Sequence, residues 1–223
     1  MTILFKRKNV LIWHKTERLY LNKMEKGFTL TEVIILFVIF LTVAILIVPL
    51  SVDDAIIKNN TSKWKRVQSS LSSIPISMIN SDSYKNNQDT SYEDFIASIK
   101  KVFPFKNSVK YKIRFMNGET PSEQYTFEEI YSTDNGATIA FKWYSNSSEK
   151  GEDKVDGMIM YDVNGKRGPN VWGKDIFGVD LYDNKIEPFG KHQDPVTIES
   201  DCSKQGTGVY CSYYYVVGVG HDD

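Results

Sequence analysis

Residues 24–33 read MEKGFTLTEV and residues 34–50 read IILFVIFLTVAILIVPL, and this stretch decides the fold of the chain. In its second part only Thr42 and Pro49 are not strongly apolar. The run comes close to the roughly 20 residues that an α-helix needs to cross a bilayer. The stretch therefore predicts a membrane-spanning helix over residues 28–50.

A cleaved secretory signal is the competing interpretation of this run. Such signals have an apolar core of about 7–15 residues, followed by a small-x-small cleavage site. The sequence IVPLSVDDA at residues 47–55 offers no site of that kind. The sequence therefore favours a retained helix.

The charges of the chain are distributed unevenly around this run. Residues 1–27 contain seven Lys and Arg and two acidic residues, a net charge of +5, so the remainder carries −6 of the total of −1. Basic residues that flank a membrane span stay in the cytoplasm. The C-terminal body is then expected outside the cytoplasm, and an acidic body gives no direct signal for nucleic-acid binding.

Glu32 is the one acidic residue at the mouth of the apolar run. Thr29-Leu30-Thr31-Glu32 fits a capping box, in which Thr29 is the N-cap and Glu32 bonds back to a free backbone amide. A carboxylate near hydrocarbon is costly, so it usually has a partner or a function. The residue alone leaves both interpretations open.

The string KGFTLTEV at residues 26–33, followed by the apolar helix, resembles the N-terminal signal of type IV pilins and of type II secretion pseudopilins. The resemblance implies cleavage by prepilin peptidase between Gly27 and Phe28 and N-methylation of Phe28. Pro49 stands where many pilins have a helix-kinking proline. Residues 1–27 are then a leader peptide, whose start is either Met1 or Met24.

The resemblance also implies how the mature chain assembles. The new amine of Phe28 pairs with Glu32 of a neighbouring subunit, and in a low dielectric this pair sets the register of the packed helices. The implied partners are other pilin or pseudopilin subunits, prepilin peptidase, the inner-membrane assembly platform and, before assembly, membrane lipid. The implied location is the inner membrane, with one span and an extracytoplasmic C-terminal domain, and then the filament.

The body is predicted to be α+β, with the long N-terminal helix packed on a small antiparallel sheet domain, as in pilins. The helix is expected to continue over residues 51–80, and residues 81–223 form the globular, β-rich domain. A second helix is predicted over residues 91–103 from its apolar face and its charged ends. The apolar face of the continued helix is predicted from Ala55, Ile56, Trp64, Val67, Leu71 and Ile74, and alternation predicts strands at 109–116, 125–131, 137–144 and 157–163.

Residues 161–190 combine glycines, among them those at 165, 168, 173 and 178, with several carboxylates. Asp162, Asn164 and Asp175 are candidate ligands of a structural calcium ion, because loop carboxylates and carbonyl groups suit this cation. Some pseudopilins hold calcium in their C-terminal region, and the pattern is similar to a loop of minor pilin-like proteins. The interpretation that we favour is a glycine-rich turn in which aspartates cap backbone amides.

Cys202 and Cys211 enclose eight residues, and outside the cytoplasm they are expected to form a disulfide. Many pilins likewise have a C-terminal disulfide loop. A zinc site with His192 and His221 is the alternative, although its spacing is not that of a zinc finger.

No catalytic motif is apparent: G-x-S-x-G, the P-loop and HExxH are all absent. We therefore predict a pilin-like subunit, not an enzyme, with no catalytic residues and no cofactor besides the candidate calcium. The length and aromatic content of the body favour a minor subunit. The alternative is a single-pass membrane-anchored extracytoplasmic binding protein.

Overall fold

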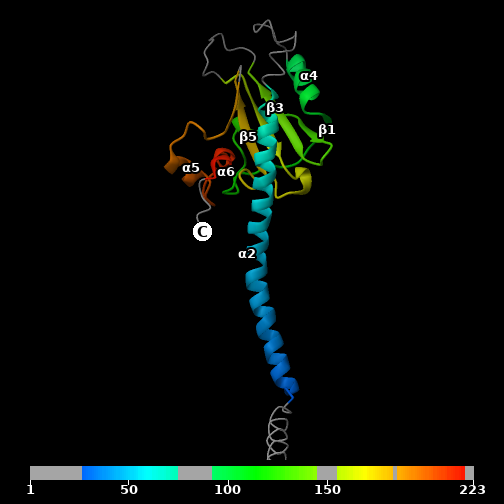
Figure 1. Ribbon diagram of the computed structural model, residues 1–223, viewed down its shortest axis with the longest axis vertical. Coiled ribbons are helices and arrows are strands. Elements are labelled where there is room, and N and C mark those ends of the chain that lie inside the picture. The colour runs from blue at the N-terminus through cyan, green and yellow to red at the C-terminus, as the bar shows by residue number, and fades with distance from the viewer. Residues whose placement is uncertain (1–26, 75–91, 145–154, 183–184, 219–223) are drawn as a thin grey trace, which may run out of the picture. The chain divides into compact units, whose positions relative to one another are not determined.

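The protein is described here by a computed structural model, which covers residues 27–74, 92–144, 155–182 and 185–218 (Figure 1). The chain divides into two compact units, residues 1–53 and residues 54–223, and each is described by itself. The elements are α2 (Leu30–Leu71), α4 (Tyr92–Val102), β1 (Phe105–Val109), η1 (Glu123–Tyr125), β2 (Ile130–Thr133), β3 (Thr138–Trp143), β4 (Gly157–Asp162), η2 (Gly165–Arg167), β5 (Ile176–Leu181), β6 (Ile186–Pro188), α5 (Pro195–Asp201) and α6 (Cys211–Val217).

The first unit contains the beginning of helix α2. Within the described residues, no helix is both long enough and apolar enough to cross a membrane. The span predicted over residues 28–50 includes residues 46 and 48–50, whose side chains lie outside the described part. Residues 1–26 of the leader predicted over residues 1–27 also lie outside it.

The second unit is built on a six-stranded sheet in the order β1-β2-β3-β4-β5-β6, with every neighbouring pair antiparallel. This arrangement is a meander, in which each strand pairs with the next strand along the chain. It confirms the predicted α+β class with an antiparallel sheet. Central strand β4 is buried along its whole length, which shows that both faces of the sheet are covered.

The two faces of the sheet carry separate hydrophobic cores, because successive side chains of a strand point to opposite faces. On one face, Ile159 and Tyr161 of β4 pack with helices α2 and α4. On the other face, Met158 and Met160 pack with the segment that precedes β2, which includes Phe115. Helices therefore cover one face, and an extended segment of chain covers the other.

The end of helix α2 packs on the sheet through an aromatic anchor, and Figure 1 shows it crossing the strands. Trp64 is fully buried, and its ring stacks on Phe177 of β5 with the ring centroids 5.1 Å apart. Its indole N–H donates to the carbonyl of Ser212 in α6 at 2.8 Å. This single side chain thus joins α2, the sheet and α6.

The predicted apolar face of this part of α2 is confirmed toward its C-terminal end and wrong at its beginning. Trp64, Leu71 and Ile74 are fully buried, whereas Ala55 and Ile56 are exposed. Counting back from Trp64 by helical turns leads to residues 60 and 57, not to 55 and 56. Position 60 is an asparagine, which an apolar pattern does not select.

Asn60 is nevertheless buried, with 2 % of its surface exposed. Its side-chain amide donates to the carbonyl of Lys174 at 3.2 Å. The hydrogen bond offsets the cost of burying a polar group. Asn60 therefore fixes α2 against the chain just before β5.

The strand predictions hold in the centre of the sheet and fail at its edges. Strands β3 and β4 match the predictions at 137–144 and 157–163. The strand predicted over 109–116 is wrong, because β1 already ends at Val109. The strand predicted over 125–131 is wrong in its first part, because β2 begins only at Ile130. Strands β5 and β6 were not predicted, since both lie in the stretch interpreted as a loop.

Helix α4 confirms the helix predicted over residues 91–103. Phe95 and Ile99 are fully buried one helical turn apart, and the ring of Phe95 stacks on Trp143 with centroids 4.5 Å apart. The predicted end of the first helix near residue 80 lies outside the described residues, and α2 ends at Leu71.

Candidate functional site

The predicted processing site lies just before helix α2, in a segment without regular structure. The side chain of Phe28 is 74 % exposed. A Cβ atom added at Gly27 would meet no other atom within 4 Å. The Gly27–Phe28 bond is therefore not protected by packing within the described residues.

The start of α2 is closed by the predicted capping box. The carboxylate of Glu32 accepts hydrogen bonds from the amide of Thr29 at 2.8 Å and from its hydroxyl at 2.9 Å. The Thr29 hydroxyl in turn accepts from the amide of Glu32 at 3.3 Å. Both of these hydrogen bonds to the carboxylate end on Oε2 of Glu32, so within the described residues Oε1 remains accessible to a further donor.

The apolar side chains that follow have little packing within the described part of the first unit. Phe37 is 62 % exposed, Phe40 is 69 % exposed and Ile45 is 71 % exposed. Exposed apolar surfaces of this extent mark sites that contact lipid or other proteins. Thr42 satisfies its own hydroxyl by donating to the carbonyl of Ile39 at 2.8 Å, as a polar residue in apolar surroundings must.

The second region of interest is the C-terminal loop, which the predicted disulfide closes. Cys202 and Cys211 are bonded to each other, with their Cα atoms 5.1 Å apart. Neither sulfur is then available to zinc, so the alternative zinc site is wrong. Of its two proposed histidines, His192 contacts Glu187, and His221 lies outside the described residues.

Asp201 organises the inside of this loop. Its carboxylate accepts hydrogen bonds from the amide of Thr207 at 2.9 Å, the hydroxyl of Thr207 at 2.5 Å and the amide of Tyr210 at 2.8 Å. Together with the disulfide, these bonds hold the loop in one conformation. The sequence analysis missed Asp201, although its place one residue before Cys202 was a signal.

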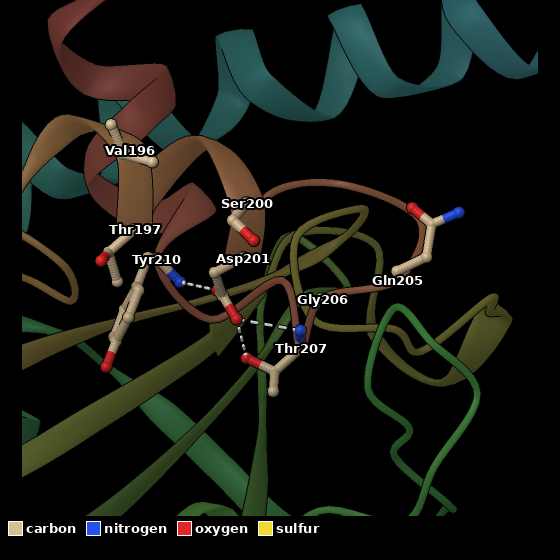
Figure 2. A pocket seen from close by; sticks show the side chains of 8 residues that line it. All are labelled: Val196, Thr197, Ser200, Asp201, Gln205, Gly206, Thr207 and Tyr210. Carbon is tan, nitrogen blue, oxygen red and sulfur yellow. Dashed lines mark hydrogen bonds between the residues drawn. The ribbon is translucent and has the colours of Figure 1, made fainter.

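A shallow pocket of about 430 Å³ opens beside this loop, as Figure 2 shows. Its only acidic group is Asp201, whose charge already faces three donors. Besides Asp201, the lining presents hydroxyl, amide, apolar and aromatic groups. The lining residues are Val196, Thr197, Ser200, Asp201, Gln205, Gly206, Thr207 and Tyr210. This composition suits a neutral, polar ligand and provides no nucleophile with an adjacent base.

The candidate calcium ligands Asp162, Asn164 and Asp175 lie in one neighbourhood. Asp162 and Asp175 are fully buried, so the negative charge of each carboxylate needs a proton, a cation or hydrogen-bond donors. Burial first, and then the charge of Asp175, raise the pKa of Asp162 to about 8. Burial also raises the pKa of Asp175 above its ordinary value, although the amides of Val171 and Asn170 oppose the shift.

Every oxygen of these two carboxylates already accepts a hydrogen bond. Asp162 accepts from the amide of Asn164 at 3.1 Å and from the hydroxyl of Tyr111 at 3.0 Å. Asp175 accepts from the amides of Val171 at 2.7 Å and Asn170 at 2.8 Å. The geometry supports the favoured interpretation, a turn in which aspartates cap backbone amides.

The donor set falls short of a calcium site. Calcium takes six to eight oxygen ligands, and the described residues include no group of three or more His, Cys, Asp and Glu side chains arranged to hold a metal ion. The side-chain oxygen of Asn164 is buried without a hydrogen-bond partner. This oxygen would add one ligand to the two carboxylates, which is still fewer than calcium takes. Calcium binding therefore stays a prediction.

Glu187 is a further buried carboxylate that the sequence analysis missed. Its side chain is 4 % exposed and contacts Lys191 at 2.5 Å, His192 at 2.5 Å and Lys185 at 3.3 Å. Burial alone would raise the pKa of Glu187, but the hydrogen bonds from Lys191, His192 and Lys185 outweigh it and lower the pKa to about 2. The cluster fixes the turn after β6, which is a structural role.

Comparison of the chain with protein-family models, with curated proteins and with solved structures finds no match. The resemblance to pilins and pseudopilins therefore rests on residues 26–50 of the sequence.

Proposed function

We propose that this chain is a pilin-like subunit, favoured as a minor one, of a type IV pilus or a type II secretion pseudopilus. The observation that carries the proposal is an exposed Gly27–Phe28 bond placed directly before a capped helix whose apolar side chains are exposed. Each part has a use in a subunit that is cleaved, held in lipid and then packed against other copies.

In this function, prepilin peptidase cleaves between Gly27 and Phe28 on the cytoplasmic side, and Phe28 is N-methylated. The subunit waits in the inner membrane with its C-terminal domain outside the cytoplasm. The assembly platform then transfers the apolar helix from lipid into a bundle of helices. The apolar surface is covered in both states, so packing and polar contacts must direct the transfer.

The capping box bears directly on how Glu32 acts in assembly. Its Oε2 atom is occupied by Thr29 of its own chain, whereas Oε1 can accept from the Phe28 amine of a neighbouring subunit. A charge left unpaired in a low dielectric is costly, so the pair fixes the register between subunits. Glu32 can serve as a cap and as a partner at the same time.

The processing step is tested by the mass of the mature N-terminus in cells that contain prepilin peptidase. The wild-type chain should begin at methylated Phe28. The Gly27→Leu variant should keep its leader, because the peptidase no longer accepts the residue before the bond. Gly27 has open space around its Cβ position, so the substitution does not strain the described structure.

The assembly step is tested by separating the charge of Glu32 from its capping function. Glutamine is also accepted at this position of a capping box, so Glu32→Gln should leave the helix intact and abolish filaments. Thr29→Val removes the capping hydroxyl but keeps the charge, and it should still assemble. Filaments of unchanged spacing and yield from Glu32→Gln would contradict the proposal.

The second candidate is a membrane-anchored extracytoplasmic binding protein, and the pocket beside the disulfide loop is the observation in its favour. Such a protein needs no cleavage after Gly27. A mature N-terminus other than Phe28, in cells with the peptidase, would favour this candidate over the first.

A further inference from the structure

Between residues 55 and 74, the charged side chains on the exposed side of α2 are all basic. Residues 55–74 contain four basic residues and no acidic one. The four side chains are exposed, and no ion pair of the described residues includes them; they are Lys58, Lys63, Lys65 and Arg66. We call this set the basic face.

The basic face covers the half of the helix that does not face the core. Lys63 and Lys65 lie on either flank of Trp64, because successive residues of a helix are about 100° apart. Trp64 and Leu71, seven residues apart, face the core. Lys58 and Lys65, also seven residues apart, share another side, because seven residues make about two helical turns. The packing of Trp64 thus fixes the outward direction of the cations.

A segment of opposite charge covers the other side of the sheet. From Phe115 to Phe141 the chain has no Lys, Arg or His. Glu119, Glu123 and Glu128 in this segment are exposed, and no ion pair of the described residues includes them. We call these three the acidic segment.

Lys142 lies beside the acidic segment, where burial lowers the pKa of its ammonium group and the charges of Glu123 and Glu128 oppose that shift. The ammonium group of Lys142 donates to the backbone carbonyls of Glu123 at 2.5 Å and Gln124 at 3.1 Å. It therefore hydrogen-bonds to carbonyl groups and not to a carboxylate, while the carboxylate of Glu119 accepts from the side-chain amide of Asn117 at 3.0 Å. Glu129, just before β2, accepts from the hydroxyl of Tyr131 and does not belong to the acidic segment.

The two charged surfaces of one molecule cannot meet. Trp64 belongs to the core on one face of the sheet, and Phe115 and Tyr125 belong to the core on the opposite face. The sheet stands between them. Only a second molecule can bring an acidic segment to the basic face.

We propose that the basic face of one copy docks on the acidic segment of the next copy. The contact joins two different surfaces, and repetition of such a heterologous contact generates rings or helical filaments. The inference rests on the proposed filament and adds the contact that orients the globular domains. The basic face also comes after the exposed apolar side chains in the sequence of helix α2.

Charge reversal and its compensation test this contact in cells that assemble the full chain. Lys65→Glu with Arg66→Glu should lower the yield of sheared filaments about tenfold, the effect expected from losing two or three exposed ion pairs. Adding Glu119→Lys and Glu128→Lys should restore most of the yield. The matched control is Lys166→Glu with Arg167→Glu, an exposed basic pair elsewhere, which should assemble normally.

An unchanged yield from the reversed basic face, or a combined variant no better than the single reversal, would overturn the proposed contact. All variants should still begin at Phe28, which separates a failed contact from failed processing. A photo-cross-linker placed at exposed Ser69 tests the contact without filaments, in membranes. It should join residues 115–131 of a second copy, and adducts elsewhere would overturn the contact even if the chain is processed as proposed.

Discussion

Helix α2 has apolar residues in both of its halves, but the two halves use them differently. Trp64 in the second unit is fully buried, whereas Phe40 in the first unit is 69 % exposed. The first half is much the more apolar in sequence, and yet almost all of its described side chains are exposed. The hydrophobicity of a helix alone therefore does not show whether its apolar side chains pack in the core of the same chain or contact lipid or another molecule.

The largest expected difference between the two halves is in stability. Trp64→Ala should lower the free energy of unfolding by about 3–5 kcal/mol, because it leaves a cavity beside Phe177 and breaks the bond to Ser212. Phe40→Ala should change it by less than about 0.5 kcal/mol, the usual range for exposed sites. Denaturant unfolding of the full chain in detergent measures both, and equal losses would show that the comparison is wrong.

The same two halves show what sequence patterns can predict. The capping box at Thr29 and Glu32 was predicted correctly, since it depends on neighbouring residues only. The burial of Asn60 could not be predicted, because its partner Lys174 is far away in sequence. Local chemistry is visible in a sequence, and partners brought together by the fold are not.

The missed strand β5 has the same cause. Gly178 suggested a loop, but in the structure it makes room for a distant ring: a Cβ atom at this position would lie 2.1 Å from Phe189. Helix α5, by contrast, had a visible signal. Asp194 caps it by accepting from the amide of Thr197 at 3.1 Å, and Pro195 follows the cap.

The disulfide should contribute the next largest effect, and only to the second unit. Closing a loop of about ten residues is worth roughly 2.5–3 kcal/mol in the chain-entropy model. Cys202→Ser with Cys211→Ser should lower the unfolding free energy by about that amount. The double serine variant should still be cleaved before Phe28, and a loss of cleavage would show that the two units are not independent.

The buried pair of aspartates predicts a pH dependence of the second unit. The pKa of Asp162 is raised to about 8, so the folded state holds a proton that the unfolded state releases near pH 4. Stability is then greatest below pH 4 for this group, falls as pH rises through 8, and stays constant above. Between pH 4.5 and 8 the loss should be at least about 2 kcal/mol.

Asp162→Asn isolates this contribution, because asparagine resembles the protonated aspartate and can still accept from the amide of Asn164 and bond to Tyr111. The variant should be more stable than the wild type at pH 8 and similar to it at pH 4.5. A wild type and variant with parallel pH profiles would show that Asp162 carries no such proton.

The smallest expected effect concerns calcium, and it separates the two interpretations of the turn after β4. If the aspartates only accept from three backbone amides and from the hydroxyl of Tyr111, as their hydrogen bonds indicate, a chelator should not shift the melting temperature. Calcium bound to the folded state would instead stabilise it by mass action. It would also remove the pH dependence, because a divalent cation beside Asp162 and Asp175 favours their charged forms. A calcium-dependent rise in melting temperature that disappears in Asp175→Asn would therefore establish the cation site, and the loss of the raised pKa of Asp162 would confirm it independently.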